Sequence, residues 1–262
     1  MSDAPVICEI EDSIAHITLN TPDNGNVINL PMAEALSDVA RQVESTDGLR
    51  AVLVDARGKM FCAGGDIRAM DASRDDLPGM IHRLVRTAHD AILRLGRLPV
   101  PVVGALNGAV AGGGLGLAMC ADYLVAADNA RFCAAHTMIG LSGDCGVTFF
   151  LPRVIGLRRA RRMTLTNETI NAETALDWGL IEEVVAADAL ADTARKRAAM
   201  MAGNATNGLI ASKKLTGASL GAALEAHLGR ELEQMVACSR THDAREGIDA
   251  FANKRTPAYT GR

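Results

Sequence analysis

The sequence predicts an α/β protein whose last part is helical, and three observations lead to this fold class. Short apolar runs typical of buried strands alternate with segments whose apolar residues recur at helical spacing. Two of the strand-like runs are followed by glycine-rich turns. Beyond Gly146 the pattern becomes mainly helical, with breaks at Gly203-Asn204 and Gly217. We therefore expect a core over residues 1–200 and a C-terminal helical region over residues 201–262.

The first predicted elements are a β-hairpin, a helix and a strand. Residues 6–10 and 14–19 alternate between apolar and polar side chains around a short polar turn, which is typical of paired strands. Asn29 suits the N-cap of a helix over residues 31–44, because its side chain can accept a hydrogen bond from a first-turn N–H. Residues 50–55 form an apolar run that predicts a short buried strand.

The middle of the chain continues the alternation. After a loop, residues 71–78 are polar and aperiodic, which predicts a surface loop or a mobile lid. Apolar residues recur at helical spacing over residues 80–95, and the prolines that follow end this helix. Residues 102–106 and 123–126 are apolar runs that predict two further strands.

Composition favours a single-domain cytoplasmic protein. With 262 residues, of which 48% are apolar and 22% charged, the chain can bury a substantial core. The formal net charge of −4 argues against general nucleic-acid binding. No apolar run is long enough to cross a membrane, and the N-terminal residues lack the pattern of a secretion signal.

The strongest functional signal is the pair of glycine-rich turns at residues 61–66 and 107–114. Two backbone N–H groups that point at one oxygen stabilise the enolate or tetrahedral oxyanion of a thioester. Glycine allows a ligand carbonyl to approach the backbone closely. If Gly113 opens a helix, its free first-turn N–H groups and the helix dipole favour the same negative charge. Either segment alone is also consistent with a tight turn that has no chemical role.

Other cofactor motifs do not match. Met119 stands where the last glycine of a dinucleotide-binding fingerprint belongs, and the sequence contains no phosphate-binding loop with its lysine. The six cysteines are scattered without the spacing of metal ligands. We therefore expect neither a metal centre nor a nucleotide cofactor.

Residues 61–66, 101–118, 140–156 and 251–257 resemble the crotonase superfamily of enoyl-CoA hydratases and isomerases. The similarity runs through nearly the whole chain, with several motifs in one order. It implies a spiral of ββα turns whose C-terminal helices assemble into a trimer or a dimer of trimers. It also implies an acyl-CoA thioester as substrate, with no further cofactor.

The resemblance also implies roles for individual residues. The amides of Gly65 and Gly113 correspond to the oxyanion donors. The hydratases of the family use two glutamates, and their positions carry Gly116 and His136 here. A histidine can act as a base near neutral pH, and it can equally line a pocket without chemistry. The residues expected near coenzyme A are Ala63, Gly64, Asp66, Ile67, Arg68, Lys59 and, from a neighbouring subunit, Lys254.

A carboxylate is present at Asp144, on a glycine-flanked turn just before a predicted helix. An N-cap aspartate would occupy the same position. Residues 144–146 and 150–153 also resemble phenylacetate-pathway isomerases, which act on ring-epoxide and 3-enoyl-CoA thioesters and place a catalytic aspartate here. One carboxylate suffices for a double-bond shift, because it can remove a proton at C2 and return it at C4.

The basicity expected of Asp144 depends on its surroundings. A general base works best when its pKa lies near the working pH. Burial among Ile139, Leu141 and Phe149 would raise the pKa of the carboxyl in that direction, because burial disfavours the charged form.

A double-bond shift is the expected function, and three alternatives stay open. The first is an enoyl-CoA hydratase or another lyase of the superfamily. The second resembles the 4-chlorobenzoyl-CoA dehalogenases, in which an aspartate at the position of Asp144 attacks the ring and a histidine at the position of His89 activates water. Those enzymes carry a tryptophan where His136 stands, and only 3% of this chain is aromatic. The third is a non-catalytic acyl-CoA binder.

Overall fold

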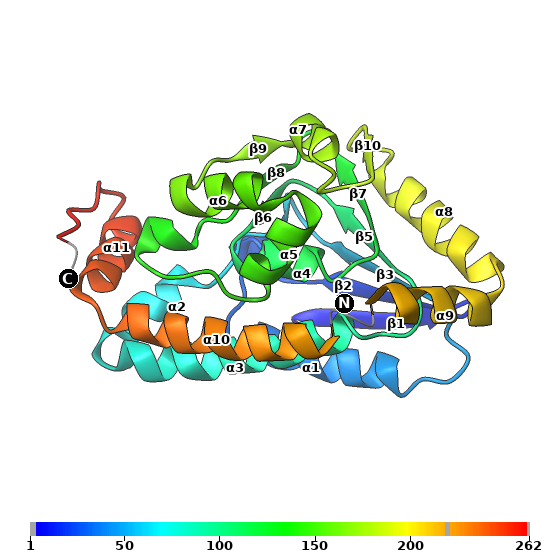
Figure 1. The fold of residues 1–262 in the computed structure, drawn as a ribbon, viewed down its shortest axis with the longest axis horizontal. Helices are drawn as coiled ribbons and strands as arrows, with labels where there is room; N and C mark the ends of the chain where they lie inside the picture. The colour runs from blue at the N-terminus through cyan, green and yellow to red at the C-terminus, as the bar shows by residue number, and fades with distance from the viewer. Residues whose placement is uncertain (1–3, 218–220, 261–262) are drawn as a thin grey trace.

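A computed structural model describes residues 4–217 and 221–260. Its centre is a six-stranded sheet (Figure 1). In spatial order the strands are β1 (Val6–Glu11), β2 (Ile14–Leu19), β3 (Ala51–Ala56), β5 (Val102–Leu106), β7 (Tyr123–Ala127) and β10 (Glu183–Val185). β1 and β2 pair antiparallel as a hairpin, and the other neighbours are parallel, with Val54 opposite Gly104 in the centre.

A second, smaller sheet lies beside the first. It contains β4 (Met60–Cys62), β6 (Ala109–Ala111), β8 (Arg131–Cys133) and β9 (Ile170–Asn171), in that order. β3, β5 and β7 of the large sheet are each followed along the chain by β4, β6 and β8 of the small sheet, and a helix or helical turn comes next. This repeat is the spiral of ββα turns that the sequence resemblance implied.

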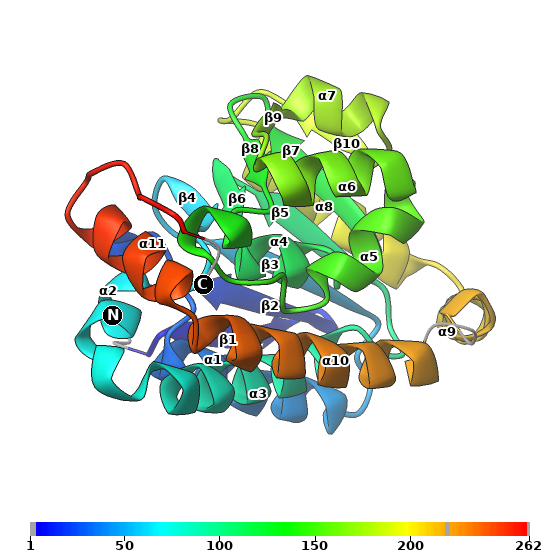
Figure 2. The same cartoon turned by 60° about the vertical axis from the view of Figure 1, so that its left-hand side comes forward.

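Helices cover both faces of the large sheet. Below it lie α1 (Leu30–Glu44) and α3 (Leu77–Leu95), and α10 (Gly221–Ser239) packs along α3 (Figures 1 and 2). On the other face α8 (Leu190–Gly203) packs on β3, β5 and β7, where its apolar residues form a second, smaller core. The main core therefore lies between the sheet and the layer formed by α1 and α3.

The remaining helices are short, and most lie around the small sheet or near the C-terminus, whereas α9 follows α8 at the end of the molecule away from α11 (Figure 1). They are α2 (Ile67–Ala72), α4 (Gly113–Ala118), α5 (Val147–Val154), α6 (Leu157–Thr166), α7 (Ala172–Asp177), α9 (Thr206–Gly217) and α11 (His242–Ala252), with 3₁₀ turns η1 (Pro22–Asn24), η2 (Arg74–Asp76) and η3 (His136–Ile139). α11 packs against both α2 and η3. The division at residue 200 stays a prediction.

Most sequence predictions of elements are confirmed, and one is wrong. Asn29 caps α1, since its Oδ1 accepts a hydrogen bond from the Met32 N–H at 3.0 Å. Residues 71–78 do not form a loop: they contain the end of α2, the turn η2 and the start of α3. Leu77 is only 1% exposed, and Pro78 suits a first helical turn because its missing N–H has no partner there anyway.

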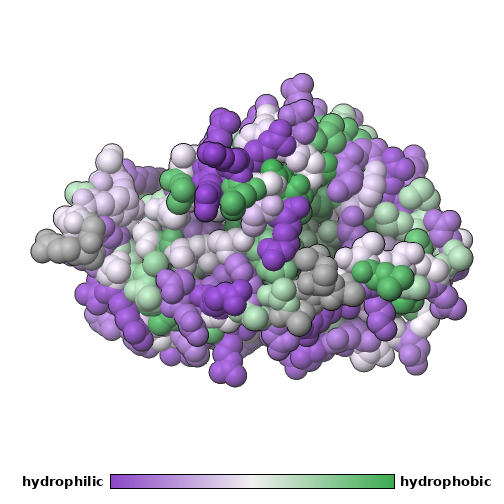
Figure 3. Space-filling view, in the orientation of Figure 1, coloured by the Kyte–Doolittle hydropathy of each residue, from purple (hydrophilic) through white to green (hydrophobic). Residues whose placement is uncertain are grey.

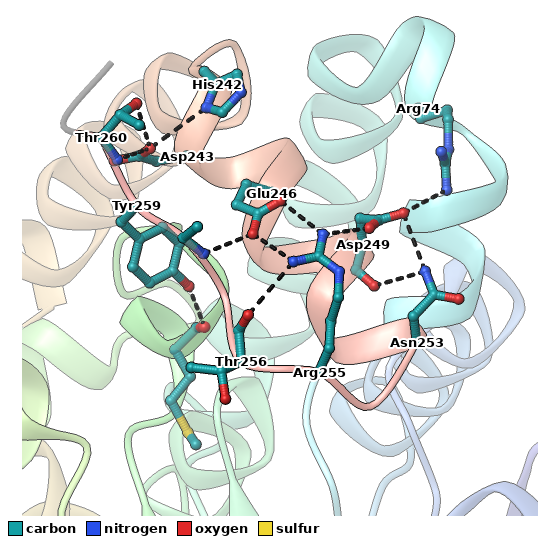
Figure 4. A network of polar contacts seen from close by, with 12 residues as sticks. Arg74, His242, Asp243, Glu246, Asp249, Asn253, Arg255, Thr256, Tyr259 and Thr260 are labelled. Carbon is teal, nitrogen blue, oxygen red and sulfur yellow. Dashed lines mark hydrogen bonds and ion pairs between the residues drawn. The ribbon is translucent and has the colours of Figure 1, made fainter.

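The C-terminal segment is fastened by a polar network around Arg255 (Figure 4). The Arg255 guanidinium donates to Glu246 at 2.6 and 2.7 Å and to Asp249 at 2.5 Å. These hydrogen bonds lower the pKa of the Glu246 carboxyl to about 2. The Tyr259 hydroxyl donates to the carbonyl of Met138 in η3 at 2.5 Å. The end of the chain therefore joins α11 to the turn that carries His136.

The surface is mostly hydrophilic along the lower edge of the view in Figure 3, where α3 and α10 lie, and apolar atoms gather in the hollow between α5 and α9. A groove of about 620 Å³ lies between these two helices and the start of α10. Within residues 4–217 and 221–260, no helix is long and apolar enough to span a membrane. The same residues contain no cluster of three or more His, Cys, Asp or Glu side chains suited to a metal ion.

Candidate active site

The two glycine-rich turns meet at one apolar cavity of about 100 Å³. One wall consists of residues 63–65 and 112–113, which contribute backbone. Next to them lie η3 and the turn at residues 144–145, and the floor is formed by aliphatic side chains of α3. Met235 of α10 and Phe251 of α11 complete the lining. Seven separate segments of the described chain line this cavity, so the site exists only once the chain has folded.

The backbone of the two turns is in direct contact. Gly64 has a φ of +96°, and a Cβ there would lie 2.9 Å from the Ala111 carbonyl oxygen, so only glycine fits without strain. The Ile28 N–H donates to the Gly64 carbonyl at 2.7 Å and fixes this turn from outside. Gly113 is the first residue of α4, as predicted. Within the part of the chain that the structure describes, neither the Gly65 N–H nor the Gly113 N–H donates a hydrogen bond, so both are available to a ligand oxygen.

Asp144 points into this cavity and pairs with His136. Its Oδ1 lies 2.8 Å from Nε2 of His136, and the two side chains are only 14% and 10% exposed. A Cβ at Gly113 would lie 3.6 Å from the same Oδ1, so the carboxylate is next to the first turn of α4. Asp144 does not cap α5: the N-cap is Gly146, and no side chain accepts a hydrogen bond there. The capping interpretation is therefore wrong.

The pKa of Asp144 is shifted opposite to the expectation. Burial by itself raises the pKa of this carboxyl, but the positive charge and the hydrogen bond of His136 outweigh burial, and the net pKa lies below the ordinary value. For His136, burial lowers the pKa, but the Asp144 carboxylate reverses this effect and the net pKa is raised. Both shifts favour the charged form of the group concerned, so the contact favours an ionised Asp144 beside a protonated His136.

The predicted apolar surroundings of Asp144 are partly correct. Ile139 and Leu141 line the cavity as expected. Phe149 is fully buried behind it, with the Arg153 guanidinium 3.7 Å from its ring centre, and does not belong to the lining.

His89 is close to Asp144 but does not reach the cavity. Its Nε2 accepts a hydrogen bond from the Cys145 N–H at 3.0 Å, and the side chain is buried in α3. Burial lowers the pKa of His89, so the imidazole is neutral. With Nε2 occupied by a backbone donor, His89 has no free basic nitrogen to activate water in this cavity. The role implied by the dehalogenase resemblance does not fit this geometry.

Glu231 is a functional candidate that the sequence reasoning missed. This side chain of α10 is 4% exposed, and it accepts hydrogen bonds from the Gly146 N–H at 2.8 Å and the Thr148 N–H at 3.1 Å. Both donors belong to the segment that follows Asp144. A signal was available in the sequence, because a charged residue interrupts the buried stripe of Leu224, Leu228 and Met235 at helical spacing.

Gly116, the position of one hydratase carboxylate, has no room for a side chain. A Cβ there would lie 2.0 Å from the Cys145 carbonyl oxygen and 2.8 Å from the carbonyl carbon. The turn that carries Asp144 packs on this glycine, and Gly116 does not line the cavity. A second carboxylate therefore cannot enter from α4.

Comparison with known proteins decides the family. The model of the enoyl-CoA hydratase/isomerase family matches residues 9–262. The chain belongs to this family. It is 36% identical over 259 residues to a 1,2-epoxyphenylacetyl-CoA isomerase of Escherichia coli, with 98% of each chain covered. It is 32% identical over 261 residues to a trans-2-decenoyl-[acyl-carrier-protein] isomerase of Streptococcus mutans, again with 98% of each covered.

The fold agrees with solved structures of the family. The structure of an enoyl-CoA hydratase/isomerase from Pseudoalteromonas atlantica superposes with a TM-score of 0.87 at 25% identity, over 98% of this chain and 100% of that chain. The crotonase fold, and membership in a family of enzymes that act on acyl-CoA thioesters, follow from these matches together with the architecture above.

Residues expected near coenzyme A divide into two groups. Ala63, Gly64 and Ile67 line the cavity. Asp66 does not: its Oδ1 accepts the Ala69 N–H at 3.1 Å and caps α2. The basic residues expected at the phosphates are all exposed and lie outside the cavity lining: Arg68, Lys59 and Lys254.

Proposed function

We propose that this enoyl-CoA hydratase/isomerase family enzyme shifts a double bond, converting a 3-enoyl-CoA into a 2-enoyl-CoA with Asp144 as the single base. The observation that carries the proposal is the position of the Asp144 carboxylate. It faces the cavity beside the free amides of Gly65 and Gly113, and among the described residues it is the one carboxylate in the lining.

The chemistry follows from these groups. The thioester carbonyl accepts hydrogen bonds from Gly65 and Gly113, and the positive end of α4 adds to their effect. Asp144 removes a proton from C2, and the electron pair moves onto the thioester oxygen as a dienolate. Asp144 then returns the proton at C4, which leaves the double bond between C2 and C3. No atom or electron is gained or lost overall, so the reaction needs no oxidant or reductant.

His136 has a supporting role in this proposal. As the imidazolium it holds the Asp144 carboxylate through a 2.8 Å hydrogen bond and keeps it ionised, ready to accept a proton. The low pKa makes Asp144 a weak base, so the amides must supply much of the driving force by stabilising the dienolate. Removal of one such donor typically costs about 10²–10³ in rate.

The cavity favours an aliphatic acyl group. The α3 side chains on its floor are Ile81, Leu84, Val85 and Ala88, and Phe251 is the one aromatic residue in the lining among the described residues. An aromatic acyl group would gain from stacking partners that are scarce here. The two relatives described above are both named isomerases, which supports an isomerisation. The decenoyl group in the name of the second relative is aliphatic.

Hydration is less consistent with the site. The two-glutamate pattern is absent, and Gly116 leaves no space for one of the carboxylates. A hydratase reaction here would have to use the Asp144–His136 pair alone. A binder without turnover would not require the paired, buried Asp144.

An absorbance assay tests the proposal, because conjugation with the thioester appears on isomerisation and disappears on hydration. The enzyme and its Asp144→Asn variant are each given 3-hexenoyl-CoA and crotonyl-CoA. We expect a gain of conjugation with 3-hexenoyl-CoA that the substitution abolishes. Loss of conjugation from crotonyl-CoA that survives the substitution would contradict the proposal, and the absence of any change with either substrate would favour another acyl-CoA or a binder.

We also propose that the chain assembles as a trimer or a dimer of trimers. Apolar surface gathers between α5 and α9 (Figure 3), and Leu215 of α9, which lies between the groove residues Lys214 and Thr216, is 77% exposed. Isolated exposed leucines are common, but those beside an apolar groove indicate a surface that a second subunit can cover. Analytical ultracentrifugation should give three or six times the chain mass, and a monomer at micromolar concentration would contradict this.

A further inference from the structure

The turn that carries Asp144 has an unusual backbone. Cys145 has a φ of +51° and Gly146 a φ of +78°, so two consecutive residues adopt the left-handed conformation. A non-glycine residue in that region persists only when its surroundings hold it there. The contacts that hold Cys145 and Gly146 in this conformation therefore also help to fix the position of the Asp144 carboxylate.

Two buried side chains from distant helices hold the turn. His89 of α3 accepts the Cys145 N–H at 3.0 Å. Glu231 of α10 accepts the Gly146 N–H through Oε2 at 2.8 Å and the Thr148 N–H through Oε1 at 3.1 Å. The Val147 N–H between them donates to the Asp144 carbonyl at 2.9 Å. Four consecutive N–H groups after Asp144 are thus paired, two of them with Glu231.

The Thr148 hydroxyl adds a third hydrogen bond to Glu231. Its Oγ1 lies 2.6 Å from Oε1 of Glu231 and 2.6 Å from Nε2 of His227. A carboxylate can only accept, so the hydroxyl proton goes to Glu231, and the hydroxyl oxygen accepts from the His227 Nε2–H. Glu231 therefore accepts three hydrogen bonds from the segment that follows Asp144.

Burying a carboxylate costs folding free energy unless hydrogen bonds compensate for its lost hydration. Leu224, Leu228 and Met235 form the rest of the buried stripe of α10, and a leucine at position 231 would continue it. The hydrogen bonds of Glu231 go to Gly146 and Thr148 after Asp144, and its polar contact with α3 is the 3.7 Å approach of its Oε2 to Nε2 of His89, which holds the same turn. The hydrogen bonds of Glu231 therefore fix the turn after Asp144 more directly than they contribute to the packing of α10 on α3.

We propose that Glu231 is a positioning residue that fixes the turn after Asp144 and thereby aims the Asp144 carboxylate at His136 and at the oxyanion amides. This proposal rests on the proposed function for its kinetic consequences, and its geometric consequence is independent of the reaction. C-terminal helix α10 thus takes part in the active site through one side chain that does not touch the substrate cavity.

Shortening the Glu231 side chain changes the position of its carboxylate while it keeps the charge. Glu231→Asp keeps the carboxylate but withdraws it by one methylene, so it can no longer reach both N–H groups. The matched control is Glu233→Asp, on the exposed side of the same helix. Glu231→Gln, which is nearly isosteric, serves as a second variant: its single acceptor oxygen can satisfy only one side of the turn.

Two readouts test the proposal. With 3-hexenoyl-CoA, Glu231→Asp should lower kcat on the order of 10–100-fold with KM within about twofold, since the loss is one of orientation. In ¹⁵N NMR of the enzyme without substrate, the pKa of His136 should fall, because the Asp144 carboxylate has moved away. Glu233→Asp should change neither quantity.

The outcomes distinguish this proposal from the proposed function. If Asp144→Asn is fully active but Glu231→Asp still lowers the His136 pKa, the one-base mechanism fails and the positioning role stands. If Glu231→Asp and Glu231→Gln lower only the urea midpoint of unfolding, with kcat and the His136 pKa as in the unmodified enzyme, Glu231 has a purely structural role and the proposal is overturned.

Discussion

Replacing Gly116 by alanine is expected to displace the turn that carries Asp144. The new Cβ would lie 2.0 Å from the Cys145 carbonyl oxygen, whereas real Cβ atoms do not come closer than about 3.0 Å to such neighbours. The Cys145 peptide must therefore retreat by about 1 Å, and Asp144 is the preceding residue. Because a 1 Å misplacement of a catalytic group costs on the order of 10²-fold in rate, we expect kcat to fall by about that factor.

Stability should fall as well, because the added methyl group overpacks a closed site. Such insertions typically cost about 1–3 kcal/mol, which a urea titration resolves. Gly229→Ala is the matched control. This glycine lies on the exposed side of α10, nothing lies within 4 Å of its Cβ position, and alanine in a helix interior is favoured by about 0.5–1 kcal/mol. The control should keep kcat and gain slightly in stability.

A Gly116→Ala variant with both the kcat and the unfolding free energy of the unmodified enzyme would contradict this prediction. That result would mean that the Asp144 turn is not packed on α4. It would also reopen the space for a second carboxylate, and with it the two-base mechanism of the hydratases.

Four further predictions concern the Asp144–His136 pair, the cavity floor and the cap of α1. In an NMR titration His136 should have a pKa above 6.5, and this pKa should fall in Asp144→Asn, because burial is then opposed only by the charge of Glu231 and the hydrogen bond to the Ala134 backbone. Since the folded pKa of Asp144 is lowered and that of His136 raised, the pair stabilises the fold most between about pH 4 and 6.5. In urea titrations the stability difference between the unmodified enzyme and Asp144→Asn should shrink as pH rises through the folded pKa of His136. Ala88→Leu fills the floor of the cavity and should lower kcat/KM for 3-decenoyl-CoA on the order of 10-fold more than for 3-hexenoyl-CoA. Equal losses for the two substrates would mean that the acyl chain does not lie along this floor. Asn29→Ala removes the cap of α1 and should cost about 1 kcal/mol in urea unfolding without a change in KM.

Features encoded in short segments could be predicted from the sequence. The hairpin, the Asn29 cap and the helix start at Gly113 depend on residues within a few positions of one another. The two glycine-rich turns could be assigned to one site because each follows a strand and exposes backbone amides, and both line the cavity. Asp144 could be identified as a candidate catalytic carboxylate from the sequence. Whether it caps α5 or faces the cavity could not be decided before the fold was known.

Features that depend on contacts across the chain could not be predicted. The pKa of Asp144 was expected to rise because burial was foreseen, whereas the hydrogen bond to His136 required the conformation of η3, which Ala135 enters with a φ of +59°. His89 and Glu231 lie 56 and 85 positions from their partners at Cys145 and Gly146, so no local pattern reports these contacts. Similarly, the polar segment before α3 ends at Leu77, which is only 1% exposed and lines the same groove as Ile248 of α11, a residue distant in sequence.

The most direct test of the one-base mechanism is the fate of deuterium in a single turnover. 3-Hexenoyl-CoA with two deuterium atoms at C2 is mixed with excess enzyme in ordinary water, and the 2-enoyl product is analysed by mass spectrometry. If Asp144 carries the proton from C2 to C4 within a closed cavity, a substantial fraction of the product retains both deuterium atoms, one at C2 and one at C4. A product that always retains a single deuterium, with C4 protonated only from water, would contradict transfer by one carboxylate.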